Sequence, residues 1–455
     1  MIATTSRPLN HTAQHRQPRP LTPWAAGLVL VLAGASGAQA QSLAALYETA
    51  RGFDATVLAA RAQFAASQAR AEQAKAGLRP QAGLSSAAQW ARRDSGVSAL
   101  DSTSNTQNMA ISASHPLYRP VNQLNNDQAQ LSLSVAQAQL DAAEQDLMVR
   151  TTQAYFDVLA AEDTLTVVKA QKTAVAEQLA AAKRNFEVGT STVTDSREAQ
   201  ARFDLVLAQE IAAENDLRVK KLALDQLVGQ SGVAPKPLKA PVNLPALAPA
   251  DVSAWVAQAE SRHPTVVQAS KGLEIAQLET RKAQAGEGPT VDLVGQYQWA
   301  RSPVSGFTSN VRTTTASVGV QFNMPLYTGG AVQNRIQETL ALQDKARNDV
   351  QAAVRGVSQA TRAAFFGVLS GQGQVKALET AEASSQSALD ANKLGYQVGV
   401  RINIDVLNAQ SQLYQTRRDL SVARYNVLVG SLRLKQASGQ LTAEDLKEVS
   451  TLLAP

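Results

Sequence analysis

Apolar and polar side chains alternate in two pairs of short stretches, and this alternation predicts four β-strands. It is clearest at residues 289–300 and 314–327, and weaker at 80–91 and 106–118, where Ala and Ser fill many positions. Alternation over roughly ten residues that ends in Trp or Tyr is typical of a membrane-spanning strand. Ordinary hairpins packed on a soluble core show the same alternation, so this alternative stays open. The aromatic residues expected at the membrane interfaces are Trp90, Tyr118, Trp299 and Tyr327.

Two much longer stretches predict helices. Residues 121–188 contain neither proline nor glycine, and one helix over residues 120–188 would be about 100 Å long at about 1.5 Å per residue. Leu133, Leu140 and Leu147 lie seven residues apart, which is the spacing of a coiled-coil seam. A second long helix is expected at residues 331–398. Helices of this length must pack against other helices and other chains to bury an apolar stripe, but any long coiled-coil protein shows such spacing.

Each long helix is followed by a short turn and a returning helix. The turn at residues 185–195 contains Gly189, which suits a left-handed helix end, and Asp195, which suits an N-cap. A similar turn occurs 210 residues later, at residues 395–405. The returning helices are therefore predicted at residues 195–229 and 405–438.

The recurring turn belongs to a duplication of the chain. Each copy begins with a helix of about 35 residues, 43–76 or 252–285, followed by two strands, the long helix and the returning helix. The copies span residues 41–230 and 252–440. Between them, residues 231–251 contain five prolines and are expected to form an extended, stiff linker. Residues 441–455 are left as a C-terminal tail, and the polar loops at 91–105 and 300–314 are expected to be the outer loops of a barrel.

The first 40 residues have the features of a signal peptide. They are basic at the start, contain an apolar run at residues 24–35 and end in Ala38-Gln39-Ala40, which fits the small-x-small cleavage pattern. Without the three arginines of this segment, 40 basic and 38 acidic residues remain, a net charge of +2. The mature chain therefore gives no reason to expect nucleic acid as a partner.

The residue types also argue against an enzyme. The four histidines are scattered, the chain has no cysteine, and no glycine-rich phosphate loop or nucleophile elbow occurs. We therefore expect no catalytic residue, no cofactor and no metal site. Without disulfides, an exported chain has to be stabilised by packing or assembly.

Four strands cannot close a barrel, and open sheet edges are not tolerated in hydrocarbon because their N–H and C=O groups have no partners there. Two chains would give eight strands and a filled interior, whereas three would give 12 strands and an open lumen. A conduit therefore favours a trimer. We expect a mainly α-helical fold in which a 12-stranded membrane β-barrel is continuous with a cylinder of helices.

The ordered set of these features resembles the TolC-like outer-membrane channel-tunnels, the outer membrane efflux protein family. The resemblance covers about residues 42–440 and depends on the duplication, on Pro-Leu-Tyr at 116–118 and 325–327, and on residues 396–401 and 404–407. It implies a homotrimer with its barrel in the outer membrane and a 12-helix tunnel in the periplasm. It further implies a passive exit duct for type I secretion or multidrug efflux, joined by a periplasmic adaptor (membrane fusion) protein and an inner-membrane ABC, RND or MFS pump.

The same resemblance assigns roles to residues at the two turns. Tyr396 and Arg401 occupy the positions of donors, and Thr194 and Asp195 those of acceptors, in a latch that holds the periplasmic tip closed. Asp405 and Asn408 occupy the narrowest point, where relatives often carry two carboxylates, so Asn408 puts strong cation selectivity in doubt. The exposed tip residues are expected to contact the adaptor: Val188, Gly189, Thr190, Val398, Gly399 and Val400.

Simpler interpretations remain for these residues and for the whole chain. Asp195 and Asp405 can be plain helix N-caps, and Arg401 a solvated turn residue. The chain itself can be a secreted or surface coiled-coil protein, structural or adhesive, without a pore. The sequence and the resemblance leave the cargo and the class of pump open.

Overall fold

The structure is a computed structural model that describes residues 41–94, 96, 102–239, 242, 244–302 and 310–454. The expected signal peptide at residues 1–40 and the middle of each expected outer loop lie outside the described residues.

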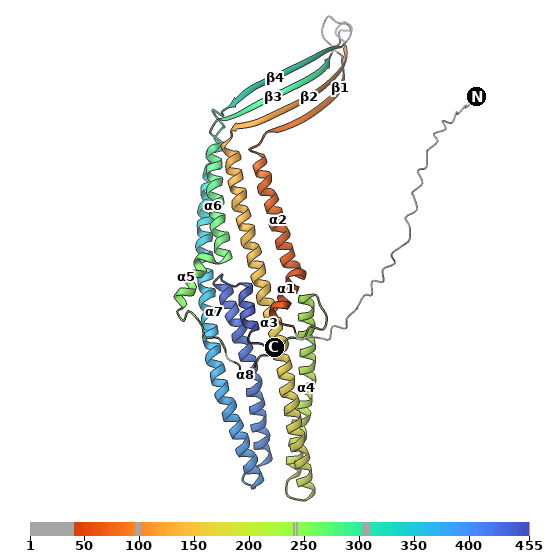
Figure 1. Ribbon diagram of the computed structural model, residues 1–455, viewed down its shortest axis with the longest axis vertical. Helices are drawn as coiled ribbons and strands as arrows, with labels where there is room; N and C mark the ends of the chain where they lie inside the picture. Colours follow the sequence, from red (N-terminus) through yellow and green to blue (C-terminus); the bar gives the residue numbers. More distant parts are fainter. Residues whose placement is uncertain are drawn as a thin grey trace, which may run out of the picture. The chain divides into compact units, whose positions relative to one another are not determined.

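The elements follow one another twice in the same order, which confirms the tandem repeat (Figure 1). The first copy consists of α1 (Leu43–Phe53), α2 (Ala55–Ala76), β1 (Gln81–Arg93), β2 (Ser102–Tyr118), α3 (Pro120–Glu187) and α4 (Val193–Val228). The second consists of α5 (Val252–Arg262), α6 (Pro264–Ala285), β3 (Thr290–Ser302), β4 (Val311–Asn323), α7 (Ala331–Gln397) and α8 (Asn403–Ala437). A final helix, α9, spans Ala443–Ser450. None of the helices in the described ranges is both long and apolar enough to cross a membrane.

The first helix of each copy is interrupted, so the prediction of one continuous helix at residues 43–76 and at 252–285 is wrong. Asp54 is extended, and its carboxylate accepts hydrogen bonds of 3.0 Å from the N–H groups of Thr56 and Val57. Asp54 therefore ends α1 and caps α2. In the second copy His263 precedes Pro264, and a residue before proline is disfavoured in the helical conformation.

The returning helices begin slightly earlier than predicted, and Asp195 is not the N-cap of α4. Thr192 occupies that position, and its hydroxyl accepts a 3.2 Å hydrogen bond from the N–H of Asp195. The carboxylate of Asp195 accepts in return from the N–H of Thr192 at 3.0 Å, which completes a capping box. In α8 the N-cap is Ile402, and Asp405 lies in the first turn, so the N-cap interpretation of Asp405 is also wrong.

Strand β4 ends at Asn323, four residues before the predicted end at 327. Pro325 follows shortly, and proline has no N–H to donate to the ladder. Pro116 is tolerated near the end of β2, where the register shifts between Pro116 and Tyr118. A bulge of this kind removes the need for a donor at that position.

The four strands form one antiparallel sheet in the order β1-β2-β3-β4 and lie side by side (Figure 1). The pairing of β2 with β3 joins the first copy to the second. Strands β1 and β4 are the two edges, and neither has a second strand partner among the described residues. The unpaired backbone groups of both edges are therefore available to other chains.

The predicted C-terminal tail is a packed element. Leu446 and Val449 of α9 are buried in the cluster that also contains Leu43 and Leu46 of α1. Lys435 of α8 forms an ion pair with Asp445 at 2.7 Å. These contacts attach the end of the chain to the middle of the helical region.

The linker between the copies lies against the same core. The buried hydroxyl of Tyr155 accepts a 2.7 Å hydrogen bond from the N–H of Lys236. Leu238 forms an isolated antiparallel bridge with Leu453, and Val233 is buried. The linker thus connects the two copies across α3.

Candidate functional site

One face of the sheet is apolar across all four strands. Residues directly opposite one another in antiparallel strands point to the same face. The register places Leu84, Ile111, Tyr297 and Ala316 in one such row, and places Leu293 opposite Val320 in another. The opposite face carries uncharged polar residues such as Ser112, Gln296 and Ser317 in the neighbouring row. The sheet therefore separates an apolar side from a polar side.

The apolar face is exposed and has the dimensions of a membrane. Val318, Val320 and Phe322 are 83, 64 and 64% exposed. The eight steps from Val291 to Trp299 correspond to about 26 Å at about 3.3 Å per residue, close to the ~25 Å apolar band of outer-membrane barrels. A face of this size and polarity is suited to contact with lipid.

The predicted interface aromatics lie toward the ends of this band. Trp90 and Trp299 point to the apolar face, and Tyr118 and Tyr327 lie at the other ends of the strands or just beyond them. Three of these four side chains are exposed, with exposed fractions of 68% for Trp90, 53% for Tyr118 and 90% for Tyr327. Their contact with lipid headgroups stays a prediction.

Below the strands, the long and returning helices form two hairpins, each held together by ion pairs. In the first hairpin α3 and α4 are joined by Lys172 and Glu210 at 2.5 Å and by Lys220 and Asp157 at 3.1 Å. In the second hairpin Arg424 of α8 contacts Glu379 of α7 at 2.8 Å. These pairs add to the apolar seams and fix each hairpin as a unit.

The contacts between the two hairpins are of a different kind. In the part of the chain that the structure describes, no ion pair joins α3 or α4 to α7 or α8. The hairpins are joined by apolar packing around Leu407 and by hydrogen bonds that each contain at least one neutral group. Each neutral hydrogen bond contributes about 1 kcal/mol, because water replaces it when it breaks.

Asn403, a residue that the sequence analysis missed, lies near the tip end of this inter-hairpin seam. It is only 1% exposed. Its side-chain oxygen accepts a hydrogen bond from the amide of Gln178 on α3, and its amide donates to the carbonyl of Asp195 at 3.5 Å. An asparagine at the start of a helix next to the turn was the available signal, but the sequence shows neither its burial nor which helix it faces.

The predicted latch residues lie at the same end of the hairpins. The hydroxyl of Tyr396 accepts a 3.2 Å hydrogen bond from the amide of Asn185, across the two hairpins. Arg401 is 3.6 Å from Asp405 within its own hairpin. Asp195 is engaged with Thr192 in the capping box, and Thr194 is exposed. Pairing of Tyr396 and Arg401 with Thr194 and Asp195 stays a prediction.

The two predicted aperture residues have different neighbours. The carboxylate of Asp405 lies beside Arg401, and the side-chain oxygen of Asn408 accepts a 2.9 Å hydrogen bond from Arg202 on α4. A guanidinium therefore lies beside Asn408, at the position where the sequence predicts a weaker acidic ring. The side chains expected at the adaptor contact are exposed, with Val188 at 72%, Val398 at 65% and Val400 at 78%. Gly189 and Gly399 have φ of +76° and +78°, which end both long helices in the left-handed region.

Comparison with known proteins decides the family. The model of the outer membrane efflux protein family matches residues 35–230 and 255–440. The chain belongs to the outer membrane efflux protein family. The two matched stretches correspond to the two copies, and the family locates the protein in the outer membrane with its helical tunnel in the periplasm.

Individual members agree with this assignment. The outer membrane protein TolC of Vibrio cholerae serotype O1 is 32% identical over 91% of this chain and 94% of its own length. The alkaline protease secretion protein AprF of Pseudomonas aeruginosa is 32% identical over 70% of this chain and 67% of its own. The solved structure of the outer membrane protein VceC from Vibrio cholerae has a TM-score of 0.75 at 19% identity, over 87% of this chain and 96% of that chain. The first two show the family, and the third shows the fold.

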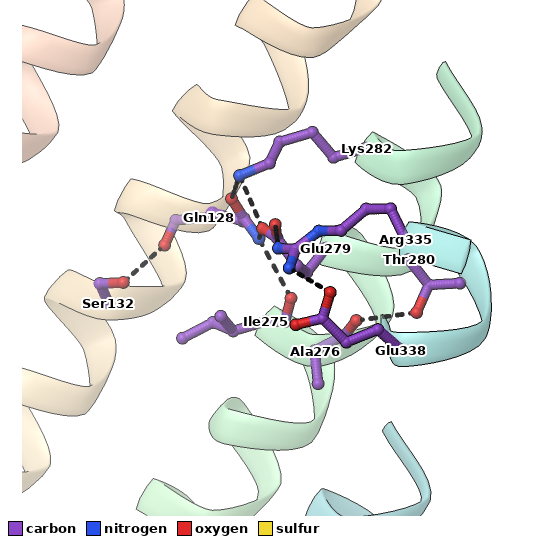
Figure 2. A network of polar contacts seen from close by, with 9 residues as sticks. All are labelled: Gln128, Ser132, Ile275, Ala276, Glu279, Thr280, Lys282, Arg335 and Glu338. Atoms are coloured by element: carbon purple, nitrogen blue, oxygen red, sulfur yellow. Dashed lines mark hydrogen bonds and ion pairs between the residues drawn. The ribbon is translucent and has the colours of Figure 1, made fainter. Parts of the chain in front are cut away.

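In this efflux protein a network of charges joins the two copies near the sheet (Figure 2). Glu279 of α6 contacts Lys282 at 2.6 Å and Arg335 of α7 at 2.8 Å, and accepts a 2.9 Å hydrogen bond from the amide of Gln128 on α3. Burial by itself would raise the pKa of Glu279, but the hydrogen bonds from Lys282, Gln128 and Arg335 outweigh it and lower the pKa to about 2. The carboxylate is therefore stabilised in its charged form.

We expect Glu279→Gln to destabilise this junction at neutral pH. The side chain of Glu279 is 24% exposed, so solvent screens part of the interaction, and the loss is about 1–2 kcal/mol. Since the folded-state pKa is below the ordinary value of 4.5, the contribution is complete above pH 4.5 and is lost as the pH falls toward 2. Urea unfolding followed by circular dichroism should give separate unfolding curves for the wild type and Glu279→Gln at pH 7, and the two curves should converge in acid. The control, Glu338→Gln, removes a 55% exposed partner of Arg335 and should change little; equal effects of both variants would contradict the role of Glu279.

Proposed function

We propose that this chain is the outer-membrane exit duct of an export system and works as a homotrimer. The observation that carries the proposal is a four-stranded sheet with one exposed apolar face and two unpaired edges, β1 and β4. Such edges have no water to bond to in hydrocarbon, so the strands must be paired by other copies. Three copies complete a 12-stranded barrel with an open lumen. Its apolar face then contacts outer-membrane lipid, and its polar face lines the passage.

The proposal extends to the partners of the duct. A relative named for alkaline protease secretion supports type I protein secretion, and the family name supports efflux. The duct receives its cargo from an inner-membrane pump of the ABC, RND or MFS class through a periplasmic adaptor. We place the adaptor on the exposed tips at residues 188–190 and 398–400.

The relatives compared are named as outer-membrane and secretion proteins rather than as enzymes, and we propose no catalytic role. Residues 1–40 direct export and are removed.

The inter-hairpin seam is proposed to be the gate. Each hairpin moves as a unit because ion pairs hold its two helices together, and the hydrogen bonds between hairpins can exchange with water. A few bonds of about 1 kcal/mol each keep the tip closed, yet the binding energy of a partner exceeds them. Asp405 narrows the aperture, and Arg202 at Asn408 reduces its negative charge.

We expect the double variant Tyr396→Phe and Arg401→Ala to raise the resting conductance of the reconstituted channel severalfold. The phenylalanine removes the hydroxyl that binds Asn185, and the alanine removes a guanidinium at the proposed latch. Single-channel recording in planar bilayers measures the effect. Tyr414→Phe, which changes a tyrosine of α8 for which no hydrogen bond of its hydroxyl is seen in the described residues, is the control. Unchanged conductance in the double variant would remove the latch assignment.

The proposed function is tested by fractionation and conductance together. The full-length protein should stay in the outer-membrane fraction after carbonate extraction, form a trimer in detergent and open pores in planar bilayers. A secreted coiled-coil or adhesive protein would be released by carbonate and would give no pores. Loss of export of a protease or a drug in cells that lack the gene, and restoration of that export by the cloned gene, then identifies the cargo class.

A further inference from the structure

Two arginines face each other at the outer end of the sheet. Arg301 on β3 is directly opposite Arg312 on β4. Both are exposed, and both point to the apolar face, because each lies two positions along its strand from a residue of the Trp299–Thr314 pair. Like charges directly opposite in adjacent strands are destabilising. The arrangement therefore requires a compensating interaction.

The position of the pair suggests where the compensation comes from. The two arginines lie two residues beyond Trp299, or about 7 Å along the strand. This is the end of the strands away from the helices, since α6 leads into the start of β3 and β4 leads into α7. The guanidinium of Arg312 lies 5.5 Å from the centroid of the Trp299 ring. An aromatic ring at the edge of an apolar band lies at headgroup level, so the two cations lie among the headgroups of the outer leaflet.

The described residues supply no anion at this position. Neither Arg301 nor Arg312 forms an ion pair with any residue that the structure describes. The connecting segment, residues 302–311, contains no aspartate or glutamate, so its sequence offers no local counter-charge. The other strand connection differs, because residues 94–101 include Asp94 and Asp101 beside Arg92 and Arg93. In sequence, the β3–β4 connection therefore lacks the acidic residues that the β1–β2 connection carries.

We propose that Arg301 and Arg312 together bind the phosphate of an anionic lipid headgroup at the outer rim of the barrel. Guanidinium groups present planar pairs of N–H donors that match phosphate oxygens, and one phosphate between two strands neutralises both. The Trp299 ring fixes one of the two guanidinium groups, so less side-chain freedom is lost on binding. The site rests on the proposed barrel with its apolar face in lipid, and continues that face into the headgroup layer.

The test compares lipids that differ in charge. The full-length protein is reconstituted in phosphatidylcholine vesicles, and quenching of tryptophan fluorescence by brominated phosphatidic acid is compared with quenching by brominated phosphatidylcholine. The wild type should prefer the anionic lipid by about fivefold for each arginine, as expected for about 1 kcal/mol per basic residue near an anionic headgroup. In Arg301→Gln/Arg312→Gln the ratio should fall to near one, and in Arg301→Lys/Arg312→Lys much of the preference should remain.

The matched control is Arg93→Gln, which removes a positive charge at the same end of the sheet but on its polar face. This variant should keep the wild-type preference. Quenching by a lipid brominated deep in the acyl chain checks insertion, so that failure of the barrel is distinguished from failure of the lipid site. If Arg301→Gln/Arg312→Gln does not insert, the wild type is measured at 0.5 M salt instead. Screening by salt should then reduce its preference for the anionic lipid about as much as loss of both arginines would. A wild-type ratio of one, an equal loss in Arg93→Gln, or displacement of the anionic lipid by inorganic phosphate would each overturn the proposal.

Discussion

Val318→Lys is expected to abolish stable assembly in the outer membrane. Val318 is opposite Gly295, near the middle of the apolar face, and is 83% exposed. A lysine on the lipid face at the bilayer midplane costs about 2–4 kcal/mol, and the proposed trimer carries it three times. We therefore expect the variant to be missing from the carbonate-washed outer-membrane fraction, and to give no heat-resistant trimer on gels.

The neighbouring Ser317 provides the control. It precedes Val318 on the same strand and points to the polar face, where a lysine keeps its water. Ser317→Lys should therefore assemble and conduct, with a shift toward anion preference because it adds positive charge to the passage. If both variants assemble equally well, the apolar face does not contact lipid, and the barrel would have to be rejected.

Asn403→Ala is expected to raise the open-to-closed ratio of the resting tip about tenfold. The change removes the acceptor for Gln178 and the donor to the carbonyl of Asp195, both across the inter-hairpin seam. The partly buried amide of Gln178 loses its partner, so the closed state is destabilised by about 1.4 kcal/mol, which is a factor of ten in the closed-to-open ratio. The fraction of time spent in the open state, from single-channel records, measures this directly.

Asn392→Ala is the matched change within one hairpin. The amide of Asn392 donates to the carbonyl of Ala388 in α7 and does not cross the seam. Its loss should leave gating unchanged. Should Asn392→Ala open the tip as far as Asn403→Ala, or should neither do so, the gate does not lie at the seam.

Local sequence patterns were sufficient to predict a helix or strand wherever a single stretch of chain contains the whole pattern. Alternation at β3 and β4, freedom from proline and glycine in α3, and the recurrence of whole segments predicted most elements and their order. The errors came where two local preferences compete. Asp54 caps a second helix where the apolar pattern alone predicts one continuous helix, and Thr192 takes the N-cap in place of Asp195 because the carboxylate fits the third position of the capping box.

The sequence by itself determined the duplication, the strand faces and the exposed turns, because each of these depends on residues close together along the chain. The tertiary structure alone decided which side chains of different elements meet. It showed that Asn403 faces Gln178, that Glu279 joins α3 to α7, and that Arg301 lies opposite Arg312. The physical reason is that periodicity specifies the face on which a side chain lies, whereas its partner depends on the register and packing of separate elements.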